Sequence, residues 1–220
     1  MADFVSRDGS RRELPGGTPL AEVLKGLPEG VRRNAVAFKS GERLLDVRLG
    51  VPESGDISVV TKHDAEALEV LRHSASHLMA YAVQELYPGA RFGIGPSIDE
   101  GFYYDFLLDV SLSPEDLVRI EDRMREILKR GDLPFVREEL ASADAARLFE
   151  KLGQPFKVEL IRDLGSETVS VYRLGDFTDL CAGPHLPDIS AAKVFKLTSI
   201  AGAYWRGDER NQMMQRIYGT

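Results

Sequence analysis

Nearly all the imidazole and thiol groups of this 220-residue chain lie in two short motifs. The first motif is His73-Ser-Ala-Ser-His77, and the second is Cys181-Ala-Gly-Pro-His185. On a helix, residues four apart lie on one face, so His73 and His77 should point the same way. Because chance grouping is improbable, we interpret these four residues as one functional site. The remaining histidine, His63, is interpreted as structural.

Two kinds of chemistry fit three imidazoles and a thiol. Zinc accepts such ligands, which would here be His73, His77, Cys181 and His185. The spacing differs from zinc fingers, whose close pairs are usually Cys-x-x-Cys. It differs from His-Glu-x-x-His metalloproteases because Ser74 follows His73. A metal-free cleft that uses the same groups for hydrogen bonding and proton transfer is the other reading, and the residues alone leave both open.

Composition and charge narrow the class of protein. The chain is 43% hydrophobic and 29% charged, as in ordinary globular proteins, and it contains no apolar run of the ~20 residues that span a bilayer. Its N-terminus lacks a signal-peptide pattern, and its single cysteine fits a reducing compartment, so we expect a cytoplasmic protein with no membrane partner. The net charge of −7 argues against a general DNA or RNA binder. Any nucleic-acid partner must be held by a local patch or by another part of a larger protein.

Residues 1–61 are predicted to form a small α/β domain. Two short strands flank the turn residues Asp8-Gly9, which predicts a hairpin. Thr18 as N-cap and Pro19 at the first helical position predict a helix over Leu20–Lys25. Three further strands are expected at 34–39, 43–47 and 57–61. A hairpin, a helix and more strands follow the order of a ubiquitin-like β-grasp fold.

Residues 63–220 are predicted to form an α+β domain with a mainly antiparallel sheet and a long helix that bears His73 and His77. Apolar residues at three- and four-residue steps predict that helix over Asp64–Tyr87. Ser113-Pro114 begins a second helix that closes near Gly131, and a third runs from Ser142 to Leu152. Strands are expected at Phe156–Ile161, Thr168–Leu174 and Val194–Ile200.

Two loops carry residues of interest. Gly183-Pro184 interrupts helix and sheet alike, which favours a tight loop that presents Cys181 and His185 to a cleft. The run from Ala203 to Arg210 mixes aromatic residues with arginines. It fits either stacking on an RNA end or a loop that closes the fold.

Several motifs together resemble those of bacterial threonyl-tRNA synthetases, and the resemblance covers the whole chain. Besides the two His/Cys motifs these are Ile94-Gly-Pro-Ser-Ile-Asp-Glu-Gly-Phe-Tyr-Tyr-Asp105, Ala201-Gly-Ala-Tyr-Trp-Arg-Gly-Asp208 and Gln215-Arg-Ile-Tyr-Gly219. The resemblance implies a TGS domain over 1–61 and an aminoacyl-tRNA editing domain over 63–220. In that family the domains that use ATP, magnesium and zinc for ligation follow this region. We therefore expect a segment of a synthetase that does not ligate threonine by itself.

The resemblance implies an editing deacylase that hydrolyses serine from mischarged Ser-tRNA(Thr) without a cofactor. Serine lacks one methyl group of threonine, and such a difference gives only ~1–3 kcal/mol of discrimination, so a second, hydrolytic site is needed. The implied partners are the 3′ end of tRNA(Thr) carrying serine and the remainder of the synthetase.

The resemblance also implies roles for particular residues. His73 should lie by the ribose and the ester, and Lys157, buried in an apolar strand, should orient or deprotonate water. Asp179 should bind the amino group of the substrate. The implied catalytic residues are His73, Lys157, Cys181 and Tyr104; the implied substrate-binding residues are His77, Asp179, His185 and Tyr103. We expect the fold to be independent of His73 and Lys157, since neither belongs to the main apolar stripe.

One departure and two alternatives accompany this interpretation. The family commonly has Arg after the cysteine, whereas this chain has Ala182, which removes a cation that could meet RNA phosphate. Alanyl-tRNA editing domains share the His and Cys skeleton, so a zinc-dependent deacylase of that type is one alternative. A non-catalytic tRNA-binding module is the other.

Overall fold

Residues 1–220, all described by the computed structural model, form a mixed α/β protein that divides into two units. The first unit comprises Met1–Leu71 together with the short segment Gly183–Pro187. The second comprises Arg72–Ala182 and Asp188–Thr220.

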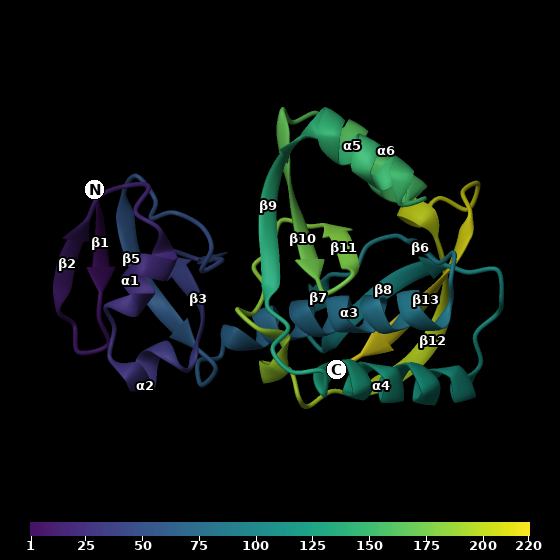
Figure 1. Cartoon of the computed structure of the whole chain (residues 1–220), viewed down its shortest axis with the longest axis horizontal. Helices are drawn as coiled ribbons and strands as arrows, with labels where there is room; N and C mark the ends of the chain where they lie inside the picture. Colours follow the sequence, from purple (N-terminus) through teal and green to yellow (C-terminus); the bar gives the residue numbers. More distant parts are fainter. The chain divides into compact units, whose positions relative to one another are not determined.

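The first unit contains a five-stranded sheet in the order β2-β1-β5-β3-β4 (Figure 1). Its strands β1 and β5 are parallel, and its other pairs are antiparallel. Side chains that include Phe4, Leu20 and Phe38 form its core. The elements are β1 (Ala2–Val5), β2 (Arg11–Leu14), α1 (Leu20–Lys25), α2 (Glu29–Arg32), β3 (Ala35–Ser40), β4 (Arg43–Leu45) and β5 (Gly55–Thr61).

The expected hairpin and the first helix of this unit are confirmed. Strands β1 and β2 pair antiparallel on either side of the predicted turn, and α1 has the predicted bounds. The expected cap is wrong: Pro19 is the N-cap of α1, and the Thr18 hydroxyl donates to the carbonyl of Pro15 (2.8 Å). Helix α2 was not predicted, because four residues are too few to show a helical period.

The three helices expected after residue 63 are present. Helix α3 spans Ala67–Leu86 and contains residues 73 and 77. Helix α4 spans Pro114–Leu128, begins at the capping box of Ser113 and Asp116, and is followed along the chain by α5 (Ser142–Lys151).

Two antiparallel sheets complete the second unit (Figure 1). In the larger sheet β12, β13, β8 and β6 are neighbours in that order, and β7 also pairs with β8. In the smaller sheet β10 lies between β11 and β9. The strands are β6 (Arg91–Phe92), β7 (Ser97–Ile98), β8 (Gly101–Leu107), β9 (Phe135–Ala141), β10 (Thr168–Leu174), β11 (Phe177–Leu180), β12 (Leu197–Tyr204) and β13 (Met213–Gly219). Short 3₁₀ turns occur at Ile189–Ala191 and Trp205–Gly207.

The strand predicted at Phe156–Ile161 is wrong, because these residues lie in helix α6 (Pro155–Leu164). Pro155 begins the helix and Gly165, at a φ of 59°, ends it, as is usual for such residues. Short apolar runs do not distinguish a buried helix from a strand. Helix α6 packs beside α5, and Val158 and Ile161 join the core that α5 and β10 form. Lys157 therefore lies on a helix.

Within the aromatic run near residue 205, Trp205 packs into the fold, whereas Tyr204 is 40% exposed. Trp205 is buried, with its ring centroid 4.8 Å from that of Phe156, and its Nε1–H donates to Glu159 (3.2 Å). The Trp205 ring is therefore not available to stack on RNA.

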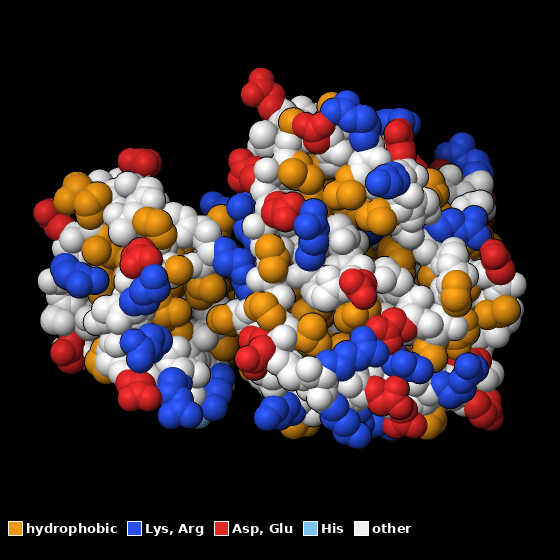
Figure 2. All heavy atoms as spheres, viewed as in Figure 1, with side chains coloured by type: hydrophobic (Ala, Val, Ile, Leu, Met, Phe, Trp, Pro, Cys, Tyr) orange, Lys and Arg blue, Asp and Glu red, His pale blue; other side chains and the backbone are white.

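The molecular surface shows no single-sign charge field on the face drawn in Figure 2, where basic and acidic side chains are interspersed. This agrees with the expectation that any nucleic-acid contact is local. None of the helices has the length and apolar character needed to cross a membrane.

Candidate functional site

Helix α3 presents the first pair of site residues. The His73 and His77 rings lie 5.2 Å apart and are nearly perpendicular. His73 is half-buried, whereas His77 is buried. One turn along, the Ser76 hydroxyl donates to the carbonyls of His73 (2.8 Å) and Gly95 (2.7 Å). This bond ties the helix to the loop that follows β6.

Cys181 follows strand β11 and meets the first histidine. Its Sγ lies 3.3 Å from His73 Nε2. Its backbone is held to β10 by Ser170, whose carbonyl accepts from the Cys181 N–H (3.2 Å) and whose hydroxyl donates to the Cys181 carbonyl (2.5 Å). The thiol is therefore fixed beside an imidazole and remains half-buried.

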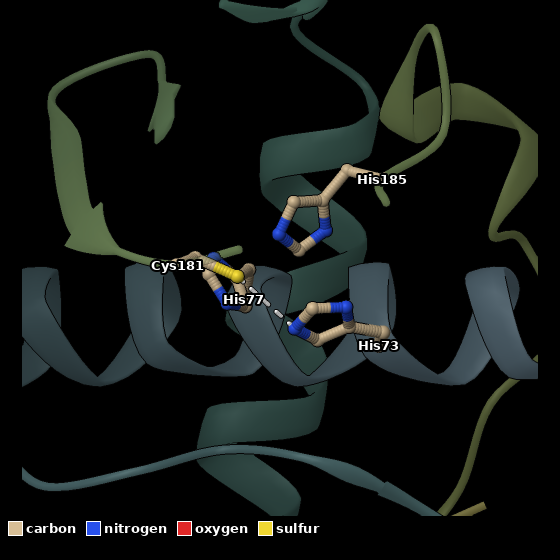
Figure 3. A group of neighbouring side chains, drawn as sticks. All are labelled: His73, His77, Cys181 and His185. Carbon is tan, nitrogen blue, oxygen red and sulfur yellow. Dashed lines mark hydrogen bonds between the residues drawn. The ribbon is translucent and has the colours of Figure 1, made fainter. Parts of the chain in front are cut away.

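The four residues of the two motifs gather into one group (Figure 3). The ligand atoms of His73, His77, Cys181 and His185 all lie within 4.8 Å of one another. Such a group can hold a metal ion, and its set of three nitrogens and one sulfur is compatible with zinc.

A buried charged network lies against α3. Lys157 on α6, Asp179 on β11 and Tyr104 on β8 are each almost fully buried. The Tyr104 hydroxyl donates to Asp179 Oδ2 at 2.5 Å. Lys157 Nζ forms an ion pair with Asp179 Oδ1 at 2.5 Å, at an angle outside hydrogen-bond geometry. Three elements therefore meet around one carboxylate.

The ammonium group of Lys157 is surrounded by oxygen acceptors. Besides the Asp179 carboxylate, its Nζ donates to the carbonyl of Gly93 (2.6 Å) and to the Tyr104 hydroxyl (3.0 Å). Two of the three N–H groups of the ammonium donate to these oxygens, and the contact with Asp179 is an ion pair. The side chain is thus desolvated as expected, but the geometry favours an orienting role over that of a proton acceptor.

His77 connects the histidine pair to this network. Its Nε2 lies 3.5 Å from Asp179 Oδ2, and the rings of Tyr104, Phe135 and Phe177 surround it. Burial, helped by the nearby His73 and Lys157, lowers the pKa of His77 well below its usual value. His77 is therefore neutral at pH 7, with one ring nitrogen donating and the other accepting.

Tyr104 is a fixed donor in the network. Burial, and then the negative charge of Asp179, raise the pKa of Tyr104 well above its usual value. The phenol therefore remains protonated, and its O–H donates a hydrogen bond to Asp179. The carboxylate itself is held on two sides, by Lys157 and by Tyr104.

Tyr103 is not brought to this network. Side chains alternate along a strand, so Tyr103 and its neighbour Tyr104 point to opposite faces of β8. The guanidinium of Arg216 lies 3.9 Å from the centre of the Tyr103 ring, and Arg216 also forms two hydrogen bonds with Asp105 (2.6 and 2.9 Å). Tyr103 therefore belongs to the far side of the sheet.

Residues that were assigned no role from the sequence shape the site. The loop from Gly93 to Pro96 offers carbonyls to Lys157 and Ser76. A Cβ atom on Gly95 would lie 2.0 Å from Cδ2 of Tyr104, so only glycine allows this backbone to pack on the ring. The two glycines at spacing two after a short strand are the only sequence signal of such a close approach.

The residues of the site fall into two groups that differ in exposure. His73 and Cys181 are the half-buried groups, which a substrate or water could reach. Behind them, Lys157, Asp179, Tyr104 and His77 form a preorganised set of fixed dipoles and charges. A half-buried imidazole before such a network is suited to acid–base chemistry on a small polar substrate.

Comparison with known proteins defines the class. Residues 169–218, which run from β10 through the Cys181 motif to β13, match the family model described as threonyl and alanyl tRNA synthetase second additional domain. Along almost all of its length the chain is similar to proteins named threonine–tRNA ligase. It is 52% identical over 97% of its length to one from a Geobacter species, and 48% and 46% identical over its whole length to those of Dechloromonas aromatica and Anoxybacillus flavithermus.

The chain therefore matches threonyl-tRNA synthetases along almost all of its own length and carries the second additional domain described for the threonyl and alanyl enzymes. It covers 33%, 34% and 35% of those three relatives, so it spans about a third of their length.

Proposed function

We propose that the chain is the editing region of a threonyl-tRNA synthetase and hydrolyses serine from mischarged Ser-tRNA(Thr). The observation that carries this proposal is the half-buried His73, 3.3 Å from Cys181, in front of the buried network of Lys157, Asp179 and Tyr104. Ester hydrolysis at the 3′ end of tRNA needs a positioned water, a proton-transferring group and donors for the developing oxyanion. The site offers an imidazole for proton transfer and hydrogen-bond donors, among which a water could be held.

Each residue has a role in this proposal. His73 contacts the terminal ribose and the ester and moves the proton, with Cys181 beside it. Asp179 provides the negative charge that attracts the substrate's amino group, and Lys157 and Tyr104 hold that carboxylate in place. His77 and His185 form part of the lining of the site. Because the His77 imidazole is neutral, it adds no positive charge that would repel the substrate's ammonium group.

The N-terminal domain and the partners belong to the same proposal. We assign residues 1–61 to a TGS domain of β-grasp fold and residues 63–220 to the editing domain. The partners are the 3′ end of tRNA(Thr) and the remainder of a cytoplasmic synthetase, which would hold most of the tRNA. This division fits a chain with a net charge of −7.

The chain should hydrolyse Ser-tRNA(Thr) much faster than Thr-tRNA(Thr). In a small polar pocket the extra methyl group of threonine must displace tightly packed atoms, whereas serine fits without strain. The measurement is the release of labelled amino acid from each tRNA over time, with spontaneous hydrolysis subtracted. Equal rates on both esters, or no hydrolysis of either, would falsify the proposal. Equal binding of charged and uncharged tRNA without hydrolysis would favour the RNA-binding module instead.

We expect deacylation to proceed without a metal ion. The side chains of Lys157, Asp179 and Tyr104 supply the polar groups that a water-based mechanism needs without a metal ion. Protein purified without chelator should therefore contain far less than one zinc per chain, and chelation should leave the deacylation rate unchanged. Stoichiometric zinc, with activity lost on chelation and restored by zinc, would instead establish the zinc-dependent deacylase that the ligand set of His73, His77, Cys181 and His185 permits.

A further inference from the structure

The segment Gly183–Pro187 belongs structurally to the first unit, although it lies far from the rest of that unit in the sequence. These five residues cluster with the first unit, although the residues on either side of them belong to the second. From Cys181 to Leu186 the chain forms neither helix nor strand. The backbone polar groups of this stretch therefore need partners outside regular structure. The segment carries His185, which is buried.

Two charged side chains of the first unit supply those partners. The His185 N–H donates to Asp46 Oδ2 at 3.0 Å. The guanidinium of Arg48 donates to three successive carbonyls: that of His185 (3.4 Å), that of Leu186 (2.8 Å) and that of Pro187 (3.0 Å). One carboxylate and one guanidinium thus bind both polar groups of the His185 backbone and the two carbonyls that follow.

Asp46 and Arg48 are themselves held rigidly. They lie in the turn after β4, where Asp46 Oδ1 accepts from the Arg48 N–H (2.9 Å) and from Arg48 Nη1 (2.8 Å). Asp46 is 1% exposed, and Val47 between them is part of the core of the first unit. A planar guanidinium held in this way offers its N–H groups in a fixed geometry. The side chains of Asp46 and Arg48 are therefore held in place before they bind the segment, by the turn that carries them.

We propose that Asp46 and Arg48 are positioning residues of the first unit. Their hydrogen bonds hold the backbone that carries His185 in the position that the editing reaction needs. The inference rests on the proposed function. Removing the guanidinium would leave three carbonyls without these donors and free the segment to move. A misplacement of about 1 Å in the groups that position a substrate is enough to slow catalysis on the order of a hundredfold.

The test compares Arg48→Met with Arg11→Met in the full chain. Arg11 is a matched control, because it is an arginine of the same unit that pairs with Asp3 and Asp56 and makes none of these backbone contacts. For Arg48→Met we expect kcat for Ser-tRNA(Thr) deacylation to fall about tenfold to a hundredfold, with KM within about twofold. Amide hydrogen exchange across 183–187 should accelerate about tenfold or more, since these hydrogen bonds are lost. Arg11→Met should leave both unchanged.

A second variant keeps the test decisive if Arg48→Met does not fold. Arg48→Lys retains the charge but lacks the fork that reaches three carbonyls, so its kcat and its exchange rate should lie between the two extremes. Unchanged kcat or unchanged exchange in the Arg48 variants would overturn the inference, as would an equal loss in Arg11→Met. If the unchanged chain hydrolyses no Ser-tRNA(Thr), the proposed function fails, and the inference fails with it.

Discussion

His73→Ala should slow the deacylation of Ser-tRNA(Thr) by two or more orders of magnitude. Removing a group that transfers a proton in the transition state typically costs 10²–10⁴-fold in rate. His73 is the half-buried histidine of α3 and meets the Cys181 thiol at 3.3 Å, so it is the imidazole of that helix that a ribose or an ester could reach. The measurement is single-turnover deacylation, which separates the chemical step from tRNA binding and release.

The control for this prediction is His63→Ala. His63 is exposed and lies outside the four-residue group, so its removal should change the rate less than about twofold. The midpoint of thermal unfolding should be nearly unchanged in both variants, because neither side chain fills the core. A rate for His73→Ala within tenfold of the unchanged chain would show that the proton is handled elsewhere.

Lys157→Met should lower the free energy of unfolding of the second unit by about 3–5 kcal/mol and abolish deacylation. Removing one partner of a buried ion pair leaves the other charge uncompensated, which is the costly case. Here the charge that remains is Asp179, which is 2% exposed. The burial of this ion pair argues against the expectation that folding does not depend on Lys157. Urea unfolding, followed through Trp205 fluorescence, measures the change.

Two comparisons make the stability prediction specific. Lys151→Met removes an exposed lysine of α5, in the same unit as Trp205, and should change the free energy of unfolding by less than about 0.5 kcal/mol. The double variant Lys157→Met with Asp179→Asn removes both charges and should recover part of the lost stability. No recovery in the double variant would show that Lys157 stabilises the fold through its carbonyl and phenol contacts, not through the charge of Asp179.

Local patterns in the sequence predicted much of the fold. The hairpin β1–β2, the helices α1, α3, α4 and α5, and strand β10 were predicted close to their observed bounds, because caps, prolines and apolar periods are local signals. Helix α6 was mistaken for a strand because its apolar run is short. The sequence did contain the boundary signals of a helix, Pro155 at its start and Gly165 at its end, but they were not used in that prediction.

The site was predictable in part for a similar reason. The pairing of His73 with Cys181 follows from two matched motifs, although 108 residues separate them. The opposite placement of Tyr103 and Tyr104 depends on which face of β8 meets the network, and only the tertiary fold decides that. The roles of Asp46 and Arg48 depend on contacts with the backbone of a distant segment, for which composition and spacing give no sign.

The close approach of Gly95 to Tyr104 affects how the consequences of amino-acid substitutions in this chain should be judged. Gly→Ala adds a single methyl group and ranks among the mildest exchanges by any scale of amino-acid similarity. At position 95 that methyl group would occupy the space of the tyrosine ring, whose hydroxyl holds the carboxylate of Asp179. The severity of a substitution is here a property of the space around the residue. A predictor of variant effects that relies on chemical similarity alone would score Gly95→Ala as benign, although the change places a methyl group against the Tyr104 ring.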